Sequence, residues 1–128
     1  MNKASALNTF WSSFGIPAIA ENSSYDEQVM EGFGDPDLYI TYEIATGNVE
    51  ASVALTASIW HRSTSSETIE EKQQEIADYI GYGGRTVKVG GGYLWVKLRQ
   101  PFAQEAESGN NDLRRMLLNI EADFLTAT

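Results

Sequence analysis

The stretch that decides the fold runs from Val53 to Gly81 and reads VALTASIWHRSTSSETIEEKQQEIADYIG. In its first third, apolar residues alternate with small or polar ones, which places one apolar row on a single side of a sheet: Val53, Leu55, Ala57 and Ile59. Farther along, apolar residues recur at helical spacing between charged positions: Ile69, Ile76, Ala77 and Ile80. We therefore expect a half-buried strand over 51–62, followed by an amphipathic helix over 65–80.

Both ends of this helix have their own signals. Thr64 can offer its side-chain oxygen to the free backbone N–H groups of the first turn, and Glu67 can reach back from three residues on, as in a capping box. Gly81 supplies the left-handed residue that commonly ends a helix. The sequence thus predicts a helix that is capped by Thr64 and stopped by Gly81.

The residues before the strand predict a helix, a short strand and a hairpin. Apolar residues at helical spacing predict a helix over 4–14, whose stripe covers the sheet or, alternatively, docks on a partner: Leu7, Phe10, Trp11 and Phe14. Residues 16–20 are expected to form a short edge strand, and the polar, acidic stretch 21–37 a long loop. Alternation then predicts a strand over 38–46 that pairs with the strand over 51–62 as an antiparallel hairpin.

Three further strands are expected after the helix. Strands over 85–89 and 93–99 are separated by three glycines and share an inward apolar row: Val87, Val89, Leu94, Val96 and Leu98. A polar connection over 101–112 follows, and then a last strand with an apolar row of its own: Met116, Leu118, Ile120, Ala122 and Phe124. The fold class is therefore α+β: a single domain over 1–128, in which two helices pack on one antiparallel or mixed sheet of four to five strands.

Composition excludes several classes of protein. The chain has no cysteine and one histidine, which rules out a disulfide framework, a thiolate zinc site and a cysteine nucleophile. Its formal charge of −9 argues against sequence-specific nucleic-acid binding, because contact with phosphates needs a basic surface. No run approaches the roughly 18 apolar residues that cross a membrane, and the first residues lack a signal-peptide pattern. We expect a soluble, unsecreted protein with no membrane partner.

Candidate chemistry is sparse. His61 precedes the hydroxyl residues at 63–66, but helix capping and turn bonding explain those hydroxyls better than a serine–histidine pair does. The acids Glu31, Asp35 and Asp37 lack the spacing of a calcium loop. The three glycines at 90–92 are not followed by a lysine–serine pair, so they predict a hairpin tip rather than a phosphate cradle. We expect no catalytic residue, no metal site and no cofactor.

Several phrases of the chain carry a resemblance to a known family. They are SIWHRSTSSETIEEKQQEIADYIGYGG at 58–84, GGYLWVKLRQPFAQ at 91–104 and NNDLRRMLLNIEADFL at 110–125, with WSSFGIPA and LYITYEIATG earlier in the chain. These phrases, which extend over nearly the whole chain, resemble the tail terminator and minor tail proteins of long-tailed bacteriophages and prophages. The resemblance implies a non-enzymatic α+β subunit of the virion, assembled in the bacterial cytoplasm. It also implies a homo-oligomeric, hexameric ring that caps the tail tube protein and meets the head–tail connector protein.

The distribution of charge suggests where such subunits would meet. Residues 21–50 hold eight acids and no lysine or arginine, whereas residues 85–99 hold four bases and no acid. We predict that a basic, aromatic strand face of one copy contacts the acidic segment of the next: Lys88, Tyr93, Trp95, Lys97 and Arg99 on one side, Glu31, Asp35 and Asp37 on the other. Neutralisation within one subunit, and burial of Trp95 under the 4–14 helix, are the alternatives.

Two other functions remain open on the sequence. A head-completion or neck protein of the same phage assembly would share most of these features. A small ligand-binding or peptide-binding domain could instead use the aromatic side chains of Tyr93 and Trp95. An oligomer would favour the tail terminator or the neck protein, and a monomer with a deep apolar pocket would favour the ligand-binding domain.

Overall fold

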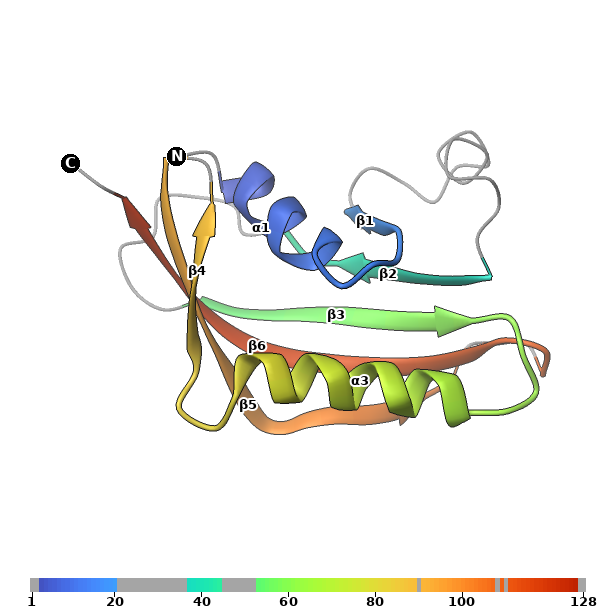
Figure 1. The fold of residues 1–128 in the computed structure, drawn as a ribbon. Coiled ribbons are helices and arrows are strands. Elements are labelled where there is room, and N and C mark those ends of the chain that lie inside the picture. Colours follow the sequence, from blue (N-terminus) through green and yellow to red (C-terminus); the bar gives the residue numbers. More distant parts are fainter. Residues whose placement is uncertain are drawn as a thin grey trace.

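The computed structural model describes residues 3–20, 37–44, 53–89, 91–107, 109 and 111–126 (Figure 1). Within these ranges the elements follow in this order: α1 Lys3–Ser12, β1 Ala18–Ala20, β2 Leu38–Tyr42, β3 Val53–His61, α3 Glu67–Ile80, β4 Arg85–Val89, β5 Gly92–Ala106 and β6 Arg114–Thr126. The strands form one curled sheet in the order β1-β2-β3-β6-β5-β4. The predicted α+β class is therefore confirmed.

The sheet has six strands in its described part and is mixed, so the prediction of four to five strands was too low. The sixth strand is β1, which the sequence predicted as a short edge strand over 16–20, and it lies parallel to β2 with Ala18 opposite Ile40 and Ala20 opposite Tyr42. The N–H of Ile40 also donates to the carbonyl oxygen of Pro17 at 2.8 Å. A segment this short has little periodicity, and its pairing with β2 is what makes it a strand.

The predicted hairpin of β2 and β3 is present, with Leu38 opposite His61 and Tyr42 opposite Ala57. The β2 strand ends at Tyr42, before the predicted end at residue 46, although the N–H of Glu43 still donates to Thr56 O at 2.9 Å. Residues 45 and 46, like most of the expected loop over 21–37, lie outside the described residues.

The predicted connection over 101–112 is wrong for its first half, because β5 continues to Ala106. The pairing of β5 with β6 shifts register between Leu98 and Ala103, and it resumes with Ala103 opposite Leu118. Pro101 lies inside this interruption, where its missing N–H costs the ladder no hydrogen bond. Pro101, which the sequence placed after the end of a strand, thus lies in a bulge within the longer strand β5.

Both helices pack on one face of the sheet and bury the core there. Helix α3 buries Ile69, Ile76 and Ile80 against the inward rows of β3, β5 and β6. Helix α1 buries its whole predicted stripe, so the sheet-covering alternative is confirmed: Leu7, Phe10, Trp11 and Phe14. The Trp11 ring stacks on Tyr42 with centroids 6.5 Å apart, and Phe14 meets the α3 residue Tyr79 edge-on at 5.4 Å. The other face of the sheet carries neither helix.

Helix α3 does not begin as predicted. Its N-cap is Ser66, which makes no side-chain capping bond, and Thr64 is exposed. The Glu67 N–H donates instead to Ser65 Oγ at 3.2 Å, so an earlier serine takes the donor that a capping box would use. The predicted stop is confirmed, because Gly81 has a φ of 77° and its N–H donates to Ala77 O at 2.8 Å.

Candidate functional site

The outward face of β4, β5 and β6 holds four of the eight residues that the sequence predicted at a subunit interface. Lys88 of β4 pairs with Tyr93 of β5, and Tyr93 pairs in turn with Leu125 of β6. Tyr93 and Leu125 each expose 44% of their surface. Trp95 and Lys97 follow on the same side of β5, because alternate residues of a strand share a face. We call these five residues the outward strip: Lys88, Tyr93, Trp95, Lys97 and Leu125.

Trp95 is half-buried, yet not under α1 as the alternative prediction had it. It pairs across the sheet with Thr86 and Asp123, while its neighbours Leu94 and Val96 point into the core. The Lys97 ammonium lies over the indole ring, 4.1 Å from its centroid, which is within the range of a cation–π contact. The side chain is therefore held in place on the outward face of the sheet.

The outward strip is less basic than the count over 85–99 suggests. The Lys97 Nζ lies 3.7 Å from Glu121 Oε2 on β6, and Asp123 of β6 lies opposite Trp95. Intramolecular neutralisation therefore accounts for Lys97. Sequence reasoning missed Glu121, Asp123 and Leu125 as members of this face because the register between β5 and β6 places them there. The alternation along β6 was the available signal.

The remaining predicted interface residues are not gathered with the strip. Arg99 is exposed but lies in the interruption between Leu98 and Ala103, where β5 has no paired partner. Asp37 is exposed at the start of β2, and its carbonyl oxygen accepts the Arg62 N–H at 2.8 Å. Glu31 and Asp35 lie outside the described residues.

Farther along the same face, a buried polar cluster joins β2, β3 and β6. Trp60 stacks on Tyr39 at 6.3 Å and donates its indole N–H to Thr41 Oγ1 at 2.9 Å. The Arg115 guanidinium lies 4.8 Å from the Trp60 ring centroid, and its Nε donates to Ser58 Oγ at 3.0 Å. Thr41 and Ser58 are buried although they point away from the helices. These contacts satisfy both buried hydroxyls, which indicates a structural role.

His61 gains no catalytic partner among the described residues. The Ser63 Oγ accepts the Ser65 N–H at 3.0 Å, and Ser65 Oγ accepts the Glu67 N–H, so turn bonding occupies these two hydroxyls as predicted. The His61 Nδ1 atom is buried without a hydrogen-bond partner in the described part of the chain. Over the same ranges, no three histidine, aspartate or glutamate side chains gather as metal ligands.

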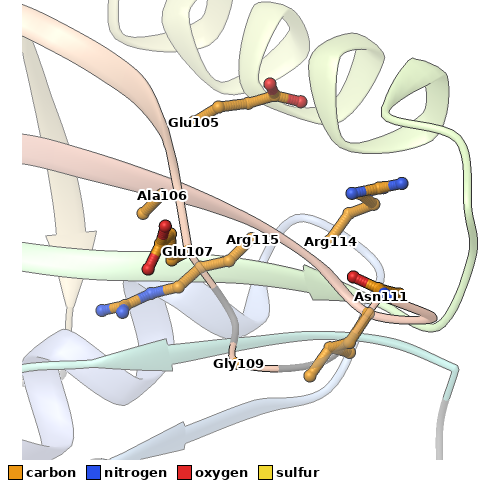
Figure 2. Close-up of a pocket in the computed structure, with 8 residues that line it drawn as sticks. Glu105, Ala106, Glu107, Gly109, Asn111, Arg114 and Arg115 are labelled. Atoms are coloured by element: carbon orange, nitrogen blue, oxygen red, sulfur yellow. The ribbon is translucent and has the colours of Figure 1, made fainter.

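Figure 2 shows a hollow of about 510 Å³ where β5 ends and β6 begins, with two acids and two arginines around it. The acids are Glu105 and Glu107, and the arginines are Arg114 and Arg115. Arg115 is held on Trp60 and Ser58, as described above, and Arg114 Nη2 donates to Thr64 O at 2.7 Å. Arg115 is thus engaged within the subunit, whereas the Arg114 Nε is buried without a hydrogen-bond partner among the described residues.

Comparisons with protein-family models, curated proteins and solved structures found no match to this chain. None of the described helices has the length and apolar character to span a membrane. The outward face of the sheet, which neither of the described helices covers, is the best candidate for function that the geometry of the described residues offers.

Proposed function

We propose that this protein is a tail terminator of a long-tailed bacteriophage or prophage. In this role it forms a homo-oligomeric ring, six copies by the family resemblance, between the tail tube protein and the head–tail connector protein. It is a non-enzymatic part of the virion, assembled in the host cytoplasm. The resemblance of the phrases at 58–84, 91–104 and 110–125 supports this role, and the α+β fold is compatible with it.

The observation that carries the proposal is the pair of exposed apolar side chains on the outward strip. Tyr93 and Leu125 are direct cross-strand neighbours and expose 44% each, with Lys88 beside them and the half-buried Trp95 next along the strand. Aromatic residues are enriched where proteins meet, and a polar, solvent-accessible rim surrounds such centres. A second copy of the chain is the occupant we propose for this strip.

The acidic segment over 21–50 is the proposed counterpart on the next copy. Of the acids named there, Asp37 is described and exposed, and it lies at the start of β2, the strand farthest in the sheet from β4 except for β1. Contact between two different surfaces of one subunit is heterologous, and such contacts close into rings when the rotation allows. Among the described residues, Lys88 is the cation of the strip without an ion pair, since Lys97 is paired with Glu121.

The test is the mass in solution, measured by light scattering at several protein concentrations, with negative-stain electron microscopy of the same samples. We expect a multiple of the 14.1 kDa subunit and closed rings. A subunit that stays monomeric at every concentration would contradict the proposal. Gene order beside the tail-tube gene would separate a terminator from a head-completion protein.

A matched pair of variants tests the strip itself. Tyr93→Ser removes one exposed aromatic side chain and should weaken the ring without lowering the melting temperature of the subunit, because little core packing is lost. Gln104→Ser changes an exposed residue on the same face of β5, beyond the register shift, and should leave assembly unchanged. Equal assembly of the two variants would place the contact elsewhere.

Two of the hollows that described residues line do not favour the small-ligand alternative. Ligand pockets are lined mainly by apolar side chains around a few polar groups. The hollow in Figure 2 has charged walls, and a second hollow near Tyr39 is lined by polar and charged residues of the turn at 62–64 and by Asp112 and Leu113.

A further inference from the structure

The turn between α3 and β4 displays one aromatic side chain with no cover from the described chain. Tyr82 is 101% exposed, more than Tyr93 or Leu125, the other large exposed hydrophobic residues. The turn is tight, because the Gly84 N–H donates to Gly81 O at 3.1 Å and both glycines have positive φ. A tyrosine has only two side-chain torsions to fix, so presenting it on a tight turn keeps the entropy lost on binding small. We call residues 81–84 the Tyr82 turn.

A groove at the other end of α3 combines an apolar floor with acidic walls. It has a volume of about 660 Å³ and runs between α3 and β5. Phe102 and Met116 contribute apolar surface, and the acids around them are Glu67, Glu70, Glu71 and Glu105. Among the described residues, none of these four carboxylates forms an ion pair. We call this the α3–β5 groove.

Helix stability explains only part of this acidity. Glu67 and Glu70 lie in the first turn of α3, where negative charge favours the helix dipole. Glu105 belongs to β5, on the opposite wall, and gains nothing from that dipole. Four like charges around an apolar floor instead favour an occupant that brings apolar surface together with a positive charge.

The Tyr82 turn brings both. Arg85 follows it directly, with its guanidinium 4.4 Å from the Tyr79 ring centroid and its Nε donating to Tyr79 O. These two contacts hold the cation against Tyr79 at the end of α3, three residues along the chain from the exposed Tyr82. The turn therefore presents an aromatic group and a cation together, which matches the floor and the walls of the α3–β5 groove.

The two surfaces lie at opposite ends of one helix. Helix α3 has 14 residues and is about 21 Å long, with the groove beside its N-terminal half and the turn after its C-terminal end (Figure 1). The turn of one chain therefore cannot fill its own groove. Two complementary surfaces at opposite ends of a subunit join copies head to tail.

We propose that the Tyr82 turn of one copy docks in the α3–β5 groove of the next, with Arg85 facing the glutamates. This inference rests on the proposed homo-oligomer and names one of its contacts. The start of β2 lies at the groove end of α3, whereas β4 lies at the turn end, as Figure 1 shows. The contact therefore joins the same two ends of the subunit as the contact between the outward strip and Asp37.

Cysteine cross-linking tests the contact directly, because the chain contains no cysteine. The double variant with Glu70→Cys and Tyr82→Cys carries two thiols in one chain, and about 15 Å of helix separates their positions. A disulfide needs Cα atoms within about 7 Å, so each bond formed must join two copies. We expect mild oxidation to give covalent multimers on a non-reducing gel. Gln104→Cys with Tyr82→Cys is the control, since Gln104 lies next to the groove in sequence but on the outward face of the sheet.

A second variant measures the contribution of the aromatic ring. Tyr82→Ser should raise the concentration at which the oligomer dissociates by about tenfold or more, as expected for an aromatic hot spot. Its melting temperature at concentrations where the parent is also monomeric should not change, because the ring is fully exposed.

The outcomes separate the two proposals. If the parent forms rings while the Glu70/Tyr82 pair cross-links no more than its control, the contact is wrong and the ring stands. The proposed contact would also be overturned if the rings of Tyr82→Ser dissociated at the same concentration as those of the parent. A parent that is monomeric at every concentration, together with a Glu70/Tyr82 cysteine pair that cross-links no more than its control, overturns both.

Discussion

Replacing Gly84 with alanine tests how closely the turn after α3 packs on β5. Gly84 has a φ of +87°, and a Cβ built on it would lie 2.8 Å from Val96 O, 2.9 Å from Lys97 Cγ and 3.0 Å from Trp95 Nε1. The lysine side chain can move aside. The Val96 carbonyl oxygen belongs to the backbone of a strand held on both sides, so either β5 or the turn has to shift.

The expected cost has two parts. A non-glycine residue in this region of backbone conformation costs about 1 to 3 kcal/mol, and forcing an extra methyl group into a packed site costs about 1 to 3 kcal/mol. Alanine also reduces the conformational entropy of the unfolded chain, which offsets about 0.4 to 1 kcal/mol of this cost. We therefore expect Gly84→Ala to lower the free energy of unfolding by about 1 to 6 kcal/mol and the melting temperature by about 4 to 24 °C.

Two neighbouring glycines serve as controls. A Cβ added at Gly83 would have no atom within 4 Å, and the backbone there is not in the left-handed region. The stability of Gly83→Ala should therefore match or slightly exceed that of the parent. Gly81→Ala also enters open space but keeps a φ of 77°, and it isolates the backbone term of about 1 to 3 kcal/mol. Urea unfolding followed by tryptophan fluorescence, at one protein concentration, would rank the three. The reasoning fails if Gly84→Ala is no less stable than Gly83→Ala.

Three other substitutions have expected outcomes in the same assay. Ile76→Ala removes a fully buried side chain under α3 and should cost about 2 to 5 kcal/mol; a loss below about 1 kcal/mol would contradict the helix packing. Ser65→Ala removes a bond at the start of α3 and should cost about 0.5 to 1.5 kcal/mol, whereas Thr64→Ala should change stability by no more than about 0.5 kcal/mol. Trp60→Phe removes the indole N–H that donates to the buried Thr41 hydroxyl, and we expect it to lower the free energy of unfolding by about 1 to 3 kcal/mol. An unchanged unfolding midpoint would argue against that bond.

Periodicity predicted those parts of the fold in which one face of an element is buried. The stripes of both helices and the inward rows of the strands are apolar at the correct spacing, and Leu94, Val96 and Ile120 are fully buried as that spacing requires. The stop of α3 at Gly81 was equally predictable, because a local backbone requirement decides it.

The start of α3 and the continuation of β5 were not predictable from the sequence. Several hydroxyl residues in a row could each have capped α3, and the local hydrogen bonds of Ser63 and Ser65 decided the start. Pro101 looked like the end of β5, because a bulge is visible only once β6 is in register.

The candidate interface depended on register in the same way. The sequence grouped Lys97 with the free bases, but the pairing of β5 with β6 places Glu121 beside it. Thr41 and Ser58 lie on the face of the sheet away from the helices, yet contacts with Trp60 and Arg115 accompany their burial. Side-chain alternation indicates which residues share a face of one strand, while neighbours on the next strand follow from the whole sheet.

The position of β6 has a consequence for how the chain reaches this structure. β6 lies between β3 and β5, although it follows every other strand in the chain. Until it pairs, β1-β2-β3 and β4-β5 are two separate fragments, each with an apolar row and an unpaired edge. Folding therefore waits for contacts that are distant in sequence, which are slow to form. During that delay the open edges of β3 and β5 can pair with other chains, so a newly made subunit is most vulnerable to aggregation just before β6 is inserted.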